Sequence, residues 1–307
     1  MTTAMEVDIA RAQWRVVLGN VKVMAGLLIL SFFLLALVAG PILEATLWEG
    51  HNNLYDPQTG YDRTIAHPSP PSGTHWLGTS SLGKDVFSMF LSATRPTLTV
   101  ATLAGVTIGL ISLVTGAVAA YRGGWVDGLV SHLSDAMVLL PAMLAVFILG
   151  VGRSNAEFGA WTVGLTFGVI YALGPATATV RAAALTVMVR PFVDAARVAG
   201  GGGWWMVTRH VLPHLVPHAA VQAMIGVTGA VVAEAFLSYF NAVGEDFGYG
   251  WMVYDGITWS NLLAGIADIP WWVMITGAGA ITLVASAFYL LGVGLREAFD
   301  PKTHRPR

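Results

Sequence analysis

Six apolar stretches dominate the chain, and each has roughly the length that a helix needs to cross a bilayer. The hydrocarbon core of a membrane is roughly 30 Å thick, so a spanning helix takes about 20 apolar residues. The third stretch is short, and the fifth contains Pro213 and Pro217 near its start. Because backbone inside a bilayer must satisfy its own hydrogen bonds, stretches of this length favour helices over strands. The pattern predicts an all-α polytopic membrane protein with six transmembrane helices, at residues 23–43, 96–121, 136–152, 158–180, 210–233 and 269–295.

The basic residues are unevenly distributed over the polar segments between these stretches. If the N-terminus lies inside, the inner segments hold 12 of the 16 lysines and arginines and the outer segments hold the other four, Arg63, Lys84, Arg95 and Arg153. Cytoplasmic loops of membrane proteins carry the positive excess. We therefore expect both termini to face the cytoplasm.

Two polar segments are too long for simple turns. Residues 44–95, on the predicted outer side, are rich in Pro, Gly and Ser, which indicates irregular structure. Residues 181–209, on the inner side, are rich in Ala, Arg and Gly. The predicted organisation is a cytoplasmic segment 1–22, a first helix 23–43, an extracytoplasmic segment 44–95, a five-helix core 96–296 and a cytoplasmic tail 297–307.

Composition supports a membrane protein and excludes several classes of function. Hydrophobic residues make up 55% of the chain and charged residues only 11%, with a net charge of -2. So small a net charge, without a basic patch, argues against nucleic acid as a partner and leaves the lipid bilayer as the expected one. The chain has no cysteine, which excludes disulfides, thiolate metal sites and cysteine nucleophiles.

Residues 194–213 combine two helix-forming runs with a break of four glycines, Gly200 to Gly203. Two short helices that project from a membrane domain can dock on a soluble partner and pass its motion to the spans. A solvated loop whose glycines merely end a helix explains the same composition. From the residues alone, both interpretations stay open.

The same residues resemble the "EAA" loop of bacterial ABC-importer permeases, the element that docks on the ATPases. The order Asp194-Ala195-Ala196, three residues, Gly200, twelve residues, Pro213 matches that loop, with Asp194 in place of the usual Glu. The resemblance implies an ATPase-coupling loop over 190–217, in which Gly201 and Arg209 also take part.

Other stretches resemble the dipeptide, oligopeptide and nickel importers, specifically their second, "C"-type permease. HWLGTSSLGKDVFS at 75–88 is similar to a signature of these proteins, with Ser80 and Lys84 in place of Asp and Arg, and AEAFLS at 233–238 and LREAFDP at 295–301 match two more. A usual proline segment is replaced by YGWM at 249–252, which leaves the solute open among di- and oligopeptides, nickel chelates, haem and related compounds.

The resemblance implies a type I permease fold in a bacterial inner membrane and a set of partners. These are a second, homologous permease, two ATP-binding subunits or a fused pair, and an extracytoplasmic solute-binding protein. ATP and Mg²⁺ would bind to the ATPases, and this chain would hold no cofactor and be no enzyme. Alternatives are a membrane-embedded enzyme or an ion-coupled secondary transporter. The first needs paired ionisable residues at matching depth, and the second is ordinarily larger and has an internal repeat.

Several side chains are candidates for contact with solute. A carboxylate at membrane depth is costly, so Glu234 lines the pathway or pairs structurally, and we leave both open. We also expect Ser238, Trp251 and Met252 on the substrate pathway. The outer segment is expected to pack over the external mouth, with Asp85 and Arg95 anchoring its return to the second helix and Trp76, Gly78 and Gly83 in the signature.

Two further patterns resemble ligand sites only superficially. Residues 78–85 nearly spell a phosphate-binding loop, but Asp85 stands at the Mg²⁺-binding hydroxyl position and no strand precedes the loop. His210, His214 and His218 are spaced to share a helix face, yet Pro213 and Pro217 interrupt that helix. We expect interfacial histidines and no metal site.

Overall fold

The computed structural model contains helices and no β-strand in the part of the chain that it describes, which is residues 17–48, 50, 52–151, 158–200, 202–242, 248–263 and 270–299. Five helical stretches are long and apolar enough to cross a membrane: α2 Val21–Ala45, α4 Val86–Arg122, Ala160–Met188, Val207–Tyr239 and α13 Trp271–Phe299. A bent pair, α5 Gly124–Leu139 and α6 Ala142–Gly150, makes a sixth if it is counted as one span. The six-span prediction is confirmed on that count.

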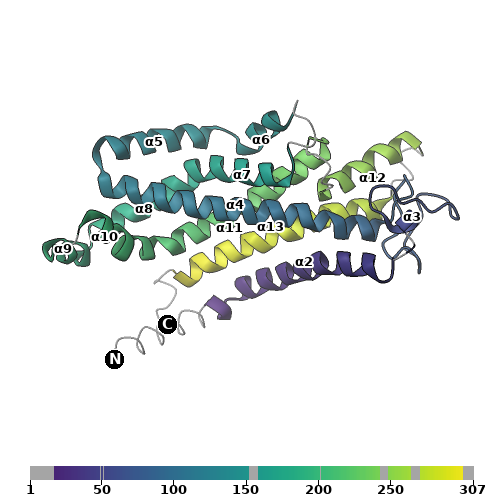
Figure 1. Ribbon diagram of the computed structural model, residues 1–307, viewed down its shortest axis with the longest axis horizontal. Helices are drawn as coiled ribbons and strands as arrows, with labels where there is room; N and C mark the ends of the chain where they lie inside the picture. The colour runs from purple at the N-terminus through teal and green to yellow at the C-terminus, as the bar shows by residue number, and fades with distance from the viewer. Residues whose placement is uncertain are drawn as a thin grey trace.

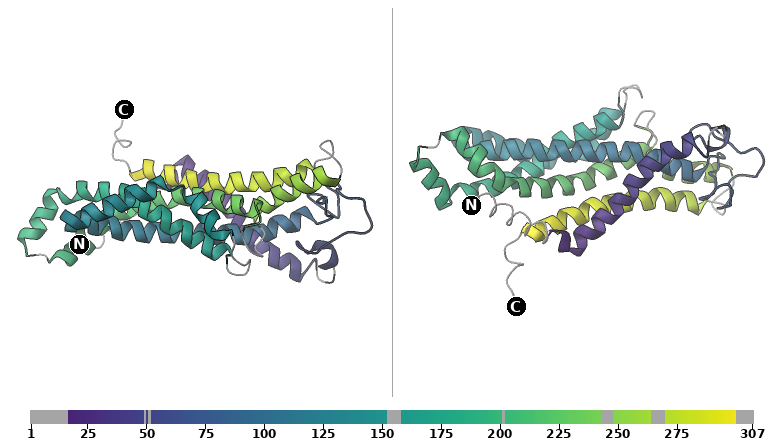
Figure 2. Two further views of the ribbon diagram at one scale, coloured as in Figure 1. Left: turned by 90° about the horizontal axis from the view of Figure 1, so that it is seen from above. Right: turned by 60° about the horizontal axis from the view of Figure 1, so that its bottom comes forward.

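The long helices run side by side along the long axis of the molecule (Figure 1). α11, Leu212–Tyr239, lies in the middle and packs against α4, α13 and the stretch Ala160–Met188. α2 crosses α13 obliquely at the edge of the bundle (Figure 2). Leu28 and Leu35 on α2 are more than 70% exposed, as expected of a helix whose outer face meets lipid and not water.

The third span is bent by 74° and begins twelve residues before the predicted position at 136. Pro141 lies in the break and has no backbone N–H to continue the ladder, so α5 ends at Leu139 and α6 starts afresh at Ala142. Asp127, near the start of α5, forms a two-pronged ion pair of 2.5 Å with Arg181.

The fourth span is interrupted by a π-helical turn. α7, Ala160–Tyr171, passes through η1, Ala172–Ala176, into α8, Thr177–Met188. Gly174 leaves the helical region just before Pro175, and proline at this place removes a ladder hydrogen bond. The helix continues to Met188, so residues 181–188, predicted as the start of the inner loop, are part of this span.

The outer segment is shorter than the predicted 44–95. α2 extends to Ala45 and α4 begins at Val86, capped by the Asp85 carboxylate, which accepts from the Ser88 N–H at 2.7 Å. The prediction of irregular structure up to residue 95 is therefore wrong for its last ten residues. Between the two helices lie α3, Asn52–Tyr55, and a compact non-helical chain.

The connection between the predicted spans 210–233 and 269–295, for which the sequence pattern predicts no helix, holds α12, Tyr249–Leu263. Two short helices, α9 Pro191–Val198 and α10 Gly203–Met206, lie at the opposite end of the molecule from α3 and α12 (Figure 1). A second π-helical turn, η2 Val207–Val211, joins α10 to α11. The molecule thus has a bundle of spans with a distinct folded element at each end.

Candidate functional site: a projecting helix pair and the exposed face of α11

The predicted coupling loop folds as two short helices around a glycine. Gly200 follows α9 with φ +82, a conformation that side chains other than glycine rarely adopt. Exposed at this end are Asp194, Ala195, Arg209 and Pro213, with Ala196 half-buried; Gly201 lies outside the described residues. The predicted helix, break and helix are confirmed as structure.

One face of each short helix is packed against the ends of the spans. Val193 of α9 and Met206 of α10 are buried, and the Phe192 ring stacks on His214 at 5.1 Å between centroids. A Cβ at Gly203 would overlap the Tyr121 hydroxyl. The absence of a side chain at Gly203 therefore allows α10 to pack closely against the end of α4. A rigid displacement of the helix pair would therefore also displace the contacting ends of α4 and α11.

The three histidines of this region have different surroundings. His214 Nδ1 lies 2.9 Å from the His210 carbonyl oxygen, the His210 ring packs edge-on against Trp205, and His218 is exposed on α11. Among the described residues, no group of three potential ligands comes together.

Two hollows open on one face of α11. The inner one has a volume of about 540 Å³ and contains Pro217, Val221 and the polar side chains of His218, Gln222 and Arg296. The other has about 410 Å³ and is apolar, with Thr228, Gly229 and Val232 from α11. Its remaining walls come from the bent third span and from α7, including Met137, Met143, Phe167 and Tyr171.

The residues of these two hollows share one side of the helix. Pro217, Val221, Thr228 and Val232 are separated by four, seven and four residues, spacings that return to the same face of a helix. The face runs from a polar inner end to an apolar middle. The sequence analysis did not predict this face, although the helical spacing of Val221, Thr228 and Val232 could have indicated it.

Glu234 and Ser238 point away from that face and into the subunit. The Glu234 carboxylate accepts from Thr97 at 3.0 Å and from Ser238 at 2.9 Å, and a Cβ at Gly248 would overlap it. Met252 is buried, and Trp251 is half-buried. None of these four lines either hollow, so their place on the pathway stays a prediction, and the geometry of Glu234 favours its structural alternative.

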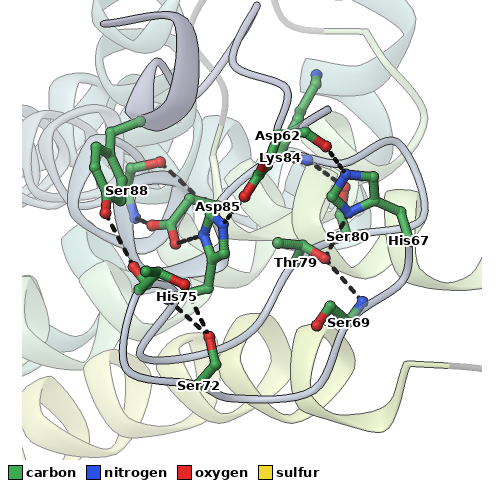
Figure 3. A network of polar contacts seen from close by, with 12 residues as sticks. Asp62, His67, Ser69, Ser72, His75, Thr79, Ser80, Lys84, Asp85 and Ser88 are labelled. Carbon is green, nitrogen blue, oxygen red and sulfur yellow. Dashed lines mark hydrogen bonds and ion pairs between the residues drawn. The ribbon is translucent and has the colours of Figure 1, made fainter. Parts of the chain in front are cut away.

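At the other end, the signature at 75–88 is the centre of a buried polar network (Figure 3). His75 is fully buried, with Nδ1 2.8 Å from Asp85 Oδ1 and Nε2 3.3 Å from Asp62 Oδ2. Burial raises the pKa of Asp85, which His75 opposes, while hydrogen bonds from Thr64 and from His75 lower the pKa of Asp62. The network ties residues 62 to 88 into one unit.

A tight turn next to this network contacts both neighbouring helices. Gly83 has φ +77 and turns the chain so that the Ser80 N–H donates to the Lys84 carbonyl at 2.8 Å. The Trp272 Nε1–H of α13 donates to the Thr79 carbonyl at 3.0 Å, and Lys84 lies over the Trp251 ring of α12. Gly78 also has positive φ, and Trp76 is exposed with its ring beside Phe87.

Asp85 lies at the return of the outer segment to α4 and caps that helix, whereas Arg95 lies away from this junction. Arg95 is inside α4, nine residues beyond its start at Val86, with an exposed side chain. A further carboxylate at this end of the molecule is Asp255 of α12, which the sequence analysis did not single out. It is fully buried, and burial raises its pKa to about 6, opposed by the Ser80 hydroxyl and the Lys84 ammonium.

Comparison with known proteins identifies the class of the chain. Residues 112–305 match the family described as binding-protein-dependent transport system inner membrane component. The chain is 32% identical over 295 residues to the dipeptide transport system permease protein DppC of Bacillus subtilis, and the matched region covers 95% of this chain and 85% of the relative.

Two further relatives carry related names. The glutathione transport system permease protein GsiD of Pectobacterium atrosepticum is 29% identical, over 95% of this chain and 91% of its own. The probable D,D-dipeptide transport system permease protein DdpC of Escherichia coli is 28% identical, over 76% of this chain and 75% of its own. These relatives are permeases of peptide transport systems.

Proposed function

Since this chain belongs to the family of binding-protein-dependent transport system inner membrane components and is a permease subunit of an ABC importer, we propose that the exposed face of α11 forms its half of the translocation pathway. The observation that carries the proposal is the alignment of two hollows along that face, from His218 to Val232. A second, homologous permease would supply the other half.

The solute is proposed to be a peptide or a closely related compound. Three relatives are named for dipeptide, glutathione and D,D-dipeptide transport, and haem or nickel chelates stay within the wider range expected from the sequence. The apolar hollow is lined by Met137 and Met143, whose flexible thioethers adapt to ligands of different shape. Such a lining suits solutes that share a backbone but differ in their side chains.

ATP hydrolysis by partner subunits would be coupled to transport through α9 and α10. We place two ATP-binding subunits, or a fused pair, against the exposed surface of Asp194, Ala195 and Arg209, with ATP and Mg²⁺ bound there and not on this chain. The buried side chains Val193 and Met206 would pass their movement to the spans as a shift between two arrangements of one assembly. This places α9, α10 and both chain termini in the cytoplasm of a bacterial cell, in accord with the distribution of basic residues.

The outer segment would receive solute from an extracytoplasmic binding protein. The ordered unit from Asp62 to Ser88, joined to α12 and α13, offers a fixed surface at the end of the molecule opposite the helix pair (Figure 1). Residues 50–70 contribute Asp62 and His67 to this unit, so they are part of the receiving surface and not a separable loop.

Two glycine substitutions test the coupling role. Gly200→Val places a β-branched residue at φ +82, whereas Gly202→Val, two residues away, meets no atom within 4 Å and requires no such φ. We expect Gly200→Val to reduce ATP-dependent uptake in proteoliposomes at least tenfold while ATP hydrolysis continues. Gly202→Val should retain uptake within about twofold of the native importer.

Both variants are to be compared at equal amounts of assembled importer. Full uptake by Gly200→Val would contradict the coupling role, and equal losses in both variants would show that the loop tolerates no bulk and has no special hinge.

A further inference from the structure

A groove runs along the opposite side of α11 from the proposed pathway. Its volume is about 800 Å³, and its floor contains the small residues Ala220 and Ala223 of α11 and Ala101 and Gly105 of α4. Leu30, Leu34 and Leu37 of α2 form one wall. Ala220, Ala223 and Val227 recur at helical spacing on the side of α11 away from Pro217 and Val221, so this groove is separate from the two hollows.

Among the described residues, Arg95 is the only charged one that lines this groove. Its side chain is exposed, and no described carboxylate lies within ion-pair distance of it. The hydroxyls of Thr99 and Thr102 donate to the carbonyls one turn earlier, at 2.9 and 2.8 Å, which leaves the wall below Arg95 apolar. The groove therefore offers one cation at one end and hydrocarbon along the rest.

The level of Arg95 matches that of a lipid headgroup. Trp161, at the start of α7, lines the same groove and is 66% exposed, and aromatic side chains of this kind favour the membrane interface. Gly164, one turn further along α7, lies against Val100 of α4, so Trp161 sits within about a turn of Arg95.

The length of the groove matches one leaflet. Arg95 and Val106, at its two ends on α4, are eleven residues apart, which is roughly 16 Å at about 1.5 Å per residue. Half of a hydrocarbon core of roughly 30 Å is about 15 Å. An acyl chain whose phosphate lies at Arg95 would end near Val106.

We propose that this groove binds a phospholipid of the outer leaflet, with its phosphate on the Arg95 guanidinium and an acyl chain against Leu30, Leu34 and Leu98. The planar guanidinium can hold two phosphate oxygens at once. A lipid held here would fill the space between α2 and the core and hold the first helix in its oblique position.

The test measures lipid retained by the purified importer in native mass spectrometry. Phosphatidylglycerol is the probe. Two compounds serve as controls: diacylglycerol, which lacks the phosphate, and inorganic phosphate, which lacks the acyl chains. We expect one retained phosphatidylglycerol per copy of this chain, at least tenfold less retention in Arg95→Gln, partial recovery in Arg95→Lys, and no change in Arg63→Gln, which alters an exposed arginine outside the groove. Diacylglycerol and phosphate should each be retained at least tenfold less than phosphatidylglycerol.

A second variant and a cross-linking experiment test the groove independently of Arg95. Ala220 is half-buried on the floor, so Ala220→Phe extends into the groove and should lower retention at least fivefold with Arg95 in place. Equal retention by the native importer, Arg95→Gln and Ala220→Phe would overturn the proposal. So would efficient cross-linking of Leu34→Cys to the second permease, since the chain has no native cysteine and such a link would show a protein helix in the groove.

Discussion

The two ends of the molecule are built in opposite ways. The outer unit around His75 is fixed by buried carboxylates, side-chain hydrogen bonds to backbone and two glycine turns whose positions leave no room for a side chain. Among its described residues, the helix pair α9 and α10 is held by apolar side chains such as Val193 and Met206. Neither the hinge glycine Gly200 nor the nearby Gly202 has an atom within 4 Å of the position that a Cβ would take. An element with few fixing contacts can move at small cost in free energy, whereas a dense polar network holds one geometry.

This contrast agrees with the two proposed tasks. A surface that receives a folded binding protein benefits from a preformed shape, because ordering costs at binding are then small. A helix pair that follows the movement of an ATPase needs a flexible hinge and stable contacts with the spans.

Among the changes proposed for the two ends, Gly83→Ala should have the largest effect on stability. The new Cβ would overlap the Tyr61 ring, and alanine would also have to adopt φ +77. Strain and displacement of the ring together should lower the free energy of unfolding by about 2 to 4 kcal/mol. Thermal unfolding of the detergent-solubilised importer measures the loss. Gly73→Ala is the matched control, because no atom lies within 4 Å of its Cβ position; equal stability of the two variants would show that the turn is not fixed.

Removing the carboxylate of Asp85 should cost somewhat less. Asp85→Ala removes the cap of α4, a loss of about 1 kcal/mol for a typical cap, and leaves His75 with only the longer contact to Asp62. With the buried partner included, we expect a loss of about 2 to 3 kcal/mol in the same assay. Asp62→Ala should cost less than Asp85→Ala, since its bond to His75 is 3.3 Å and not 2.8 Å. The reverse order would mean that Asp62 is the principal partner of His75.

Sequence reasoning located the spans and the helix pair but not the features that join them. The spans were predicted from stretches without charge, so Arg95 put the start of the second span at residue 96, although its side chain lies exposed on a continuous helix that begins at Val86. α12 was predicted as a loop because its polar residues were counted as solvated, whereas Asp255 is buried by contacts that form only when the chain folds.

The same limit applies to the site residues. Composition predicted helix, glycine break and helix within 194–213, and this needed no tertiary information. Whether Glu234 faces the pathway or the core depends on how α11 is rotated within the bundle, and its hydrogen bond with Thr97 of α4 joins residues 137 apart in the sequence. The pairing of His75 with Asp62 and Asp85 likewise joins residues 13 and 10 apart through an irregular chain, for which no periodicity gives a signal.

Asp255 should make the outer unit sensitive to pH. Its pKa is raised to about 6 from an ordinary 3.8, mainly by burial, so the folded state holds this proton more tightly than the unfolded chain. The stabilisation is complete below pH 3.8 and is lost as pH rises through 6. Its full size is at most about 3 kcal/mol.

The measurement is the unfolding temperature of the native importer and of Asp255→Asn at pH 5 and pH 8. The native protein should lose more stability between the two values than the variant, whose amide does not ionise. Lys84→Met should enlarge the native slope, because the Lys84 ammonium favours the ionised form of Asp255. Identical slopes for the native protein and Asp255→Asn would show that this carboxylate stays in one protonation state over the range.

The smallest effect is expected at the inner end, where Lys22 of α2 pairs with Glu297 of α13. Both side chains are 40% exposed or more, and exposed ion pairs contribute little to stability because water and salt screen them. A double-mutant cycle with Lys22→Met and Glu297→Gln should therefore give a coupling much smaller than the effect of Asp85→Ala, and this coupling should fall further in high salt. The inner junction of α2 and α13 also rests on apolar contacts of Val23 and Leu291, so loss of the pair should leave α2 in place. A coupling as large as the effect of Asp85→Ala would contradict the comparison, because the inner end would then be fixed by charge as firmly as the outer one.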